Sequence, residues 1–234
     1  MTRRLALALL ACGLAPAAPV PKASVPKIED VFGEIADPKS ECRFKMGKDG
    51  ALTVTVPTAH PRLEPGASST TPPLVGRKIE GDFELTVRVS AALPKTADGK
   101  GNTFLPAVLT GISVVSADDP NTGITVGAAR RLKGSDWVGA KFASFRESGY
   151  GGATEDDLTA GADEPIWFRL TRSQQTLHIE TSGDGKKWKT FVRVGVNKVG
   201  DAVTVGPVAF GCIDKGFSVT FDQYQLKPLK EDKK

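Results

Sequence analysis

The sequence predicts an all-β protein, a sandwich or jelly roll built from two antiparallel sheets. Around residues 165–194, Ile166, Phe168 and Leu170 alternate with tryptophan, arginine and threonine, the period of two expected of a strand with two different faces. About ten to twelve short runs of this kind succeed one another along the chain. No stretch keeps a helical period of 3.6 residues, and 25 glycines and 16 prolines suit a fold with many turns.

The first half of the chain supplies a hairpin and a long strand. In residues 41–57, Leu52, Val54 and Val56 alternate with threonines after a Lys-Asp-Gly turn, so this stretch is predicted to be one hairpin. Residues 58–75 are rich in proline and are predicted to be a surface connection. Residues 81–90 form the next expected strand, because every second residue from Phe83 onward is apolar.

The second half continues the pattern. Gly183 and Gly185 favour a tight hairpin turn, since glycine readily adopts positive φ. Residues 146–164 are acidic and rich in glycine, and are predicted to be a loop. Short helical turns are expected near residues 28–35 or 196–201. The remaining expected strands are residues 104–116, 124–130, 137–145, 166–171, 177–179, 188–192, 203–210 and 217–226.

The N-terminus has the features of an export signal. Arg3 and Arg4 precede the apolar residues 5–14, and small residues follow up to position 17. Ten apolar residues are too few to span a bilayer, so no transmembrane segment is expected in the mature chain. Residues 1–17 are therefore predicted to be a signal peptide of a secreted or periplasmic protein. The alternative is lipid attachment at Cys12, since a small residue precedes it.

The rest of the chain divides simply. Residues 18–30 are predicted to be a linker, 31–228 a single β-sandwich domain, and 229–234 a charged tail. A net charge of +4, with basic residues spread among 27 acidic ones, gives no sign of nucleic-acid binding. Cys42 and Cys212 remain after the signal; they are either a disulfide, as export permits, or two buried thiols. The oligomeric state is not predicted.

Several motifs resemble a known superfamily. They are WFRLTR at 167–172, SGDGKKW at 182–188, GDFE at 81–84, VGPVA at 205–209 and FSVTFD at 217–222. Together they resemble concanavalin A-like lectin/glucanase domains, and are similar to secreted bacterial regulation-of-enolase-like domains. The resemblance implies a jelly roll of two curved sheets, often with carbohydrate contact on the concave face. Residues 93–161 depart from the family pattern in length and content.

One catalytic alternative comes from three acidic residues. Glu80, Asp82 and Glu84 have the E-x-D-x-E spacing of jelly-roll glucanases, and on one strand their carboxylates would share a face. Alternation instead suggests that these acids are solvated while Phe83 and Leu85 face the core. No catalytic residues are therefore assigned, and Glu80, Asp82 and Glu84 remain the alternative for a glycoside hydrolase.

Aromatic and basic residues suggest a ligand site. Flat aromatic rings suit the C–H faces of sugars, and Trp137 and Tyr150 are the expected exposed aromatics. Their neighbours Arg130, Arg131 and Arg146 would supply polar contacts. The sequence thus predicts these five residues as ligand-binding.

Acidic residues in the predicted loop suggest a cation. Calcium takes six to eight oxygen ligands, and Glu155, Asp156, Asp157 and Asp163 provide carboxylates close together in sequence. Their spacing fits no EF-hand, and a solvated acidic loop is the alternative. Calcium is the single cofactor considered.

The function that follows is a non-catalytic, exported β-sandwich that binds glycan or another component of the cell envelope. The export signal and the lectin-like motifs support it, and no convincing catalytic set accompanies them. The alternatives are the glycoside hydrolase above and a structural or protein-interaction module, since a fold does not fix a function.

Overall fold

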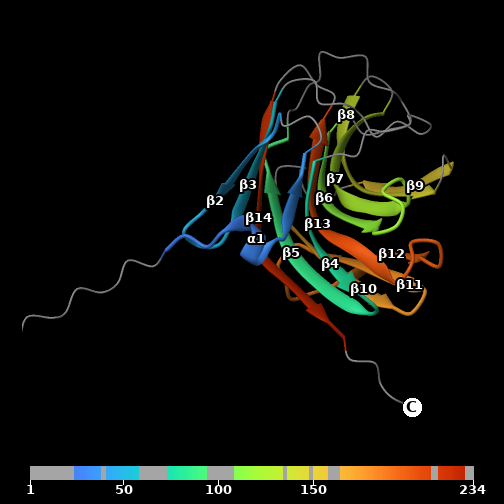
Figure 1. The fold of residues 1–234 in the computed structure, drawn as a ribbon. Helices are drawn as coiled ribbons and strands as arrows, with labels where there is room; N and C mark the ends of the chain where they lie inside the picture. The colour runs from blue at the N-terminus through green and yellow to red at the C-terminus, as the bar shows by residue number, and fades with distance from the viewer. Residues whose placement is uncertain are drawn as a thin grey trace, which may run out of the picture.

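The computed structural model describes residues 24–37, 41–57, 73–93, 108–133, 136–147, 150–157, 164–211 and 216–229. Within these residues the chain is almost entirely β, with one short helix, α1 (Ile28–Val31). The strands form two antiparallel sheets packed face to face, so the predicted all-β jelly roll is confirmed. Figure 1 shows the two sheets bending in the same sense, with β6, β7 and β8 on the inside of the bend.

Each sheet has seven described strands. Sheet A contains, in spatial order, β1 (Glu34–Ala36), β4 (Leu74–Glu80), β13 (Ala202–Gly211), β6 (Val108–Ser116), β7 (Gly123–Lys133), β8 (Asp136–Glu147) and β9 (Tyr150–Asp157). Sheet B contains β12 (Lys189–Gly195), β11 (Thr176–Ser182), β10 (Ile166–Ser173), β5 (Phe83–Ala91), β14 (Phe217–Pro228), β3 (Leu52–Val56) and β2 (Arg43–Met46). Chain-order neighbours often lie in different sheets, as a jelly roll requires.

The core lies between the sheets and follows from the alternation in sequence. Phe83, Phe168 and Phe221 from sheet B are completely buried, with 0% of their surface exposed. Ile112 and Val126 face them from sheet A within the same cluster. Because one residue in two along each strand enters this layer, the others form two outer faces, one for each sheet.

The stretch from 165 to 194 forms three adjacent strands at one side of sheet B, with β12 at the edge, so the strands predicted there are present. Leu170 in β10 pairs with Ile179 in β11 on one side and with Leu85 in β5 on the other. The turn between β10 and β11 places Gln174 at φ 53°. Three sequence-adjacent strands and one distant strand thus pack a continuous apolar layer.

The structure corrects the predicted elements in two places. Strand β4 includes the last two residues of the predicted connection 58–75 and continues to residue 80, where the sequence predicts no strand. Strand β9 lies within the predicted loop 146–164, where it pairs along β8 at the edge of sheet A. Helix α1 confirms the helical turn expected near residues 28–35, and its Ile28, inside the predicted linker 18–30, packs against the core.

Some predictions concern residues outside the described ranges. The signal peptide, Cys12, Cys212 and Asp163 belong to this group, and they stay predictions. Leu229, the first residue of the predicted tail, still donates its amide hydrogen to the carbonyl oxygen of Asp82. In the described part of the chain, no helix is long and apolar enough to cross a membrane.

Candidate functional site

The outer face of sheet A carries a row of small hydroxyl side chains. Ser113 in β6, Thr125 in β7 and Ser144 in β8 are register partners, so they lie side by side across three strands. The hydroxyl oxygens of Ser113 and Thr125 are 3.0 Å apart and hydrogen-bonded. We call these three residues the hydroxyl row; Ser113 and Thr125 are buried, with 2% and 5% of their surface exposed, and Ser144 is half-buried.

One end of this face is apolar. Five side chains form a second buried cluster, separate from the core between the sheets: Leu109, Ala129, Phe142, Val208 and Phe210. Phe142 lies two residues from Ser144 on the same side of β8, so the apolar cluster adjoins the hydroxyl row. The face therefore changes from apolar to polar along the strands.

Two glycines between these regions hold the strands close together. Gly111 in β6 pairs with Gly127 in β7. A Cβ at Gly111 would collide with the carbonyl oxygen of Val126, and a Cβ at Gly127 would collide with that of Thr110. Both positions therefore require glycine, which permits this close approach of the two backbones in the bent sheet.

Arg146 lies at the polar end of the same face. Its register partners are Gly123 in β7 and Gly151 in β9, so neither neighbouring strand places a side chain beside it. The guanidinium is half-buried and donates one long hydrogen bond, 3.4 Å from Nη2 to the carbonyl oxygen of Pro120. Burial lowers the pKa of Arg146, and the negative charge of Asp119 partly opposes this.

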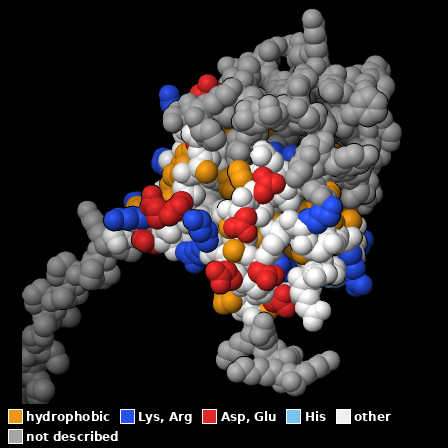
Figure 2. Space-filling model, turned by 45° about the vertical axis from the view of Figure 1, so that its right-hand side comes forward, with side chains coloured by type: hydrophobic (Ala, Val, Ile, Leu, Met, Phe, Trp, Pro, Cys, Tyr) orange, Lys and Arg blue, Asp and Glu red, His pale blue; other side chains and the backbone are white. Residues whose placement is uncertain are grey.

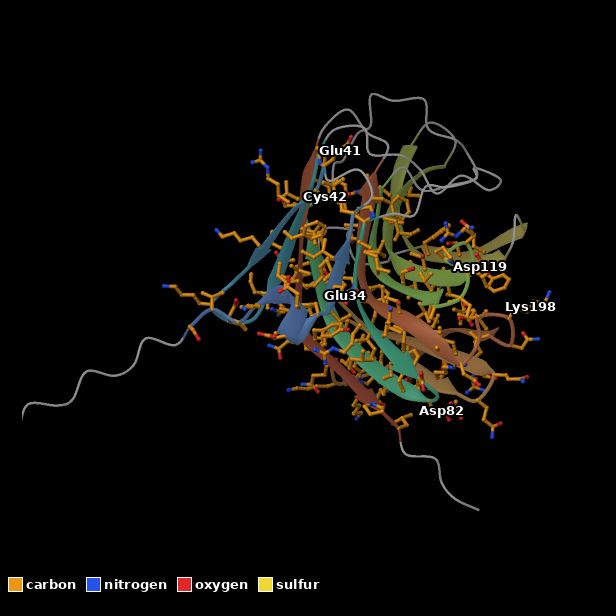
Figure 3. The ribbon with its side chains drawn as sticks, viewed as in Figure 1. Glu34, Glu41, Cys42, Asp82, Asp119 and Lys198 are labelled. Atoms are coloured by element: carbon orange, nitrogen blue, oxygen red, sulfur yellow. The ribbon has the colours of Figure 1, made fainter. Side chains whose placement is uncertain are left out.

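Asp119 is held by the turn that joins β6 to β7. Its Oδ2 accepts a 2.6 Å hydrogen bond from the Thr122 hydroxyl, and its Oδ1 accepts one from the Asn121 amide. These hydrogen bonds, the Thr122 bond first, lower the pKa of Asp119, so the carboxylate is charged at neutral pH. Figure 3 shows Asp119 in this turn, away from Asp82. The carboxylate serves the turn and influences Arg146 only through space.

The outer face of sheet B is different, because its charged groups pair with one another. Arg88 in β5 makes a bidentate ion pair with Asp222 in β14, at 2.7 Å and 2.6 Å. The same guanidinium lies 5.9 Å from the ring centre of Trp167. Trp167 is half-exposed, and a Cβ at Gly185 would come within 2.8 Å of its ring, so the loop after β11 packs against it.

A second tryptophan, Trp188, packs on the same face of sheet B. Arg169 donates to Glu180 at 2.7 Å, and its guanidinium carbon lies 4.4 Å above the ring centre of Trp188. Asp184 accepts hydrogen bonds from the amides of Lys187 and Lys186 and from the Ser182 hydroxyl, which lower its pKa to about 2. These contacts fix the SGDGKKW loop to the sheet, so we assign the two tryptophans to stability.

The predicted ligand residues do not form one cluster. Trp137 and Arg146 lie in the same strand but nine positions apart, about 30 Å of extended chain. Arg130 and Arg131 pair near Trp137, and Tyr150 pairs with Glu147 near Arg146. The side chains of Trp137, Tyr150 and Arg131 lie outside the described part. Of the five, Arg146 is the residue that the structure places beside the hydroxyl row.

The three acids of the catalytic alternative are separated. Glu80 ends β4 in sheet A, Asp82 lies in the turn after Gly81, and Glu84 lies in β5 of sheet B. Asp82 accepts a hydrogen bond from the Gln174 amide, and Glu84 is 2.8 Å from the ammonium of Lys227. The expectation that they share one strand face is wrong, because the chain passes from one sheet to the other between them.

The calcium and disulfide predictions each involve residues outside the described part of the chain. Glu155, Asp156 and Asp157 lie in strand β9 rather than in a loop, and their side chains are outside the described part. Elsewhere in the described ranges, no group of three or more metal-ligating side chains occurs. Cys42 has a free thiol whose pKa is raised to about 12 by burial and by Asp37 and Glu41. The calcium site and the Cys42–Cys212 disulfide stay predictions.

The hydroxyl row could not be found from sequence alone. Ser113, Thr125 and Ser144 come together only through the pairing of β6, β7 and β8, and no local pattern marks them. Figure 2 shows that acidic and basic side chains are interspersed on the face it displays, without a large region of one sign. The candidate site is therefore the polar half of the outer face of sheet A: the hydroxyl row with Arg146.

Two bent, seven-stranded antiparallel sheets with this connectivity define the concanavalin A-like jelly-roll fold of the lectin/glucanase superfamily. Within it, residues 153–229 match the family described as "Protein of unknown function (DUF1349)". That segment covers β10, β11, β12, β13 and β14, the part that contains the WFRLTR and SGDGKKW motifs. No curated protein matches the sequence.

Solved structures share the fold at low sequence identity. A functionally unknown protein from Saccharomyces cerevisiae has a TM-score of 0.67 and 18% identity, over 88% of this chain and 100% of its own. An alginate lyase from Klebsiella pneumoniae has a TM-score of 0.57 and 12% identity, over 80% and 85%. A xylan β-1,4-xylosidase from Bacillus halodurans C-125 has a TM-score of 0.56 and 13% identity, over 91% of this chain but 41% of its own. At these identities the likeness concerns the fold.

Proposed function

We propose that this chain is an exported, non-catalytic β-sandwich that binds glycan, or another component of the cell envelope, on the outer face of sheet A. The observation that carries the proposal is the contrast between the two outer faces. On sheet B the charged side chains are occupied by one another, whereas on sheet A the half-buried Arg146 makes one long hydrogen bond within the described residues and lies next to the half-buried Ser144. Polar side chains on a bent sheet suit a polyhydroxylated ligand.

Two further points support this proposal. The neighbours in fold include an alginate lyase and a xylan xylosidase, both named for carbohydrate substrates. The N-terminal sequence predicts export, which would bring the chain into contact with envelope or environmental polysaccharides. The glycoside hydrolase alternative lost its geometric basis when Glu80 and Glu84 proved to lie in different sheets.

A glycan array tests the proposal directly. Mature protein would be applied at millimolar calcium and again with a chelator, so that the calcium prediction is tested together with binding. We expect binding to at least one glycan, and a variant with Ser144→Phe should lose it because the new ring would cover the hydroxyl row. The control Thr171→Phe adds the same ring to the outer face of sheet B and should bind normally. A blank array would contradict glycan binding and favour a structural module.

A further inference from the structure

We infer that Arg146 recognises an anionic group on the ligand, so that the glycan bound by this face is an acidic polysaccharide. This inference rests on the proposed function and adds the chemical class of the ligand. It starts from the hydrogen bonds of Arg146, which has more donors than acceptors around it. A guanidinium has five N–H donors, and in the described part of the chain this one makes a single hydrogen bond, 3.4 Å long, to Pro120.

Three other arginines in this protein have close acceptors for their guanidinium groups. Arg88 and Arg169 each donate to a carboxylate at 2.7 Å or less, and Arg172 donates to three carbonyl oxygens, those of Gln174, Gly200 and Asp201. Arg146 is half-buried, and among the described residues its one hydrogen bond goes to a carbonyl oxygen and not to a carboxylate. A half-buried cation without close acceptors is costly unless a ligand supplies them.

The strands on either side of Arg146 place no side chain directly beside it. Its register partners there are Gly123 and Gly151. Asp119, whose charge acts on Arg146 through space, is engaged by Thr122 and Asn121 within its own turn. On the other side lies the half-buried Ser144, whose hydroxyl can donate to a ring or hydroxyl oxygen, while its register partner Thr125 is buried. The arrangement places one cation at the end of a row of neutral polar groups.

The preferred anionic group is planar and offers two oxygens. A guanidinium binds a carboxylate through two parallel hydrogen bonds, which gives both strength and orientation. A uronate in a polysaccharide presents such a carboxylate on each sugar ring, next to hydroxyls that the hydroxyl row can contact. A sulfate ester offers similar oxygens and is the second source of the same chemistry. We therefore expect binding to polyuronates, with sulfated glycans as the comparison.

Affinity electrophoresis and calorimetry with defined polymers test this inference. The probes are polygalacturonate, its methyl-esterified form, a sulfated galactan and neutral xylan. We expect polygalacturonate to bind, the methyl ester to bind about tenfold or more weakly because its carboxylates are neutral, and the sulfated galactan to bind less well than polygalacturonate. Stronger binding of the sulfated galactan would replace carboxylate by sulfate as the group recognised, and would overturn the assignment to uronates.

Matched variants separate specific recognition from general charge attraction. Arg146→Gln should weaken binding to polygalacturonate by about tenfold or more, and Arg146→Lys should restore part of it, since a lysine keeps the charge but not the fork. Arg193→Gln removes the same charge from an exposed position on β12 and should bind like the wild type. Equal weakening by Arg146→Gln and Arg193→Gln would overturn the inference. If neutral xylan binds and Arg146→Gln does not change that binding, the inference about an acidic polysaccharide is overturned and the proposed function stands. If no polymer binds, both are overturned.

Discussion

The outer faces of the two sheets have opposite construction. On sheet B, Arg88 pairs with Asp222 and Arg169 pairs with Glu180, and each of these arginines lies over a tryptophan ring. On sheet A, the hydroxyl row is small and neutral, and its one described arginine has few partners. Satisfied charge networks stabilise a surface, whereas a guanidinium with a single long hydrogen bond, like that of Arg146, keeps donors available to a ligand. In this account, the outer face of sheet B serves stability and the outer face of sheet A serves ligand recognition.

The largest expected effect comes from the glycine pair under the face of sheet A. Gly111→Ala should lower the free energy of unfolding by about 2 kcal/mol or more, because its Cβ would collide with the backbone of β7. Gly183→Ala is the control, since a Cβ there meets nothing within 4 Å. Chemical denaturation of both variants gives the comparison. Equal midpoints would show that the bend of sheet A does not depend on this close approach.

The next effect concerns the tryptophan of the SGDGKKW loop. Trp188→Ala should lower the free energy of unfolding by about 2 kcal/mol, since it removes a half-buried ring and its contact with Arg169. Trp188→Phe keeps a flat aromatic face and should lose less. Glycan binding should be unchanged in both variants if sheet B serves stability. Loss of binding with unchanged stability would reverse the roles of the two faces.

Acid should weaken the same loop. The pKa of Asp184 is lowered to about 2 from an ordinary value of 3.8, because the folded state donates hydrogen bonds to its carboxylate. A lowered pKa means stability that is present above the unfolded value and is lost as pH falls from about 4 towards 2. The stability advantage of wild type over Asp184→Asn should therefore shrink in this window. An advantage that stays constant from pH 6 to pH 2 would contradict this account of the loop.

The smallest effect is expected at Glu84. Its ion pair with Lys227 is exposed on the lysine side, at 61%, so Glu84→Gln should change the free energy of unfolding by less than about 0.5 kcal/mol. The substitution also tests the hydrolase alternative. We expect no change in any polysaccharide hydrolysis, measured as released reducing ends. Hydrolysis by the wild type that disappears in Glu84→Gln would establish Glu84 as catalytic despite its separation from Glu80.

How far the sequence predicts each face depends on how local its signals are. The alternation around Phe168 and Leu170 identified the core layer of sheet B, because consecutive side chains of a strand point to opposite faces. Strand β9 was missed because glycine and acidic residues have low strand propensity, and its pairing with β8 determines its structure instead. Propensity describes a segment alone, and an edge strand depends on its partner.

The candidate site shows the same limit. Arg146 was among the predicted ligand residues, but Trp137, grouped with it, lies nine positions away in the same strand. The spacing of Glu80 and Glu84 suggested one strand, although the positive φ of Gly81 turns the chain between the sheets. The hydroxyl row needs the register of three strands, which no local pattern contains.

The most direct test of the central claim is an NMR titration of the labelled mature protein with short oligogalacturonates. The backbone amides of Ser144 and Arg146 report on the outer face of sheet A, and the indole N–H signals of Trp167 and Trp188 report on that of sheet B. We predict saturable shifts at Ser144 and Arg146 while both indole signals stay in place. Shifts confined to the two indoles would contradict the assignment of recognition to sheet A.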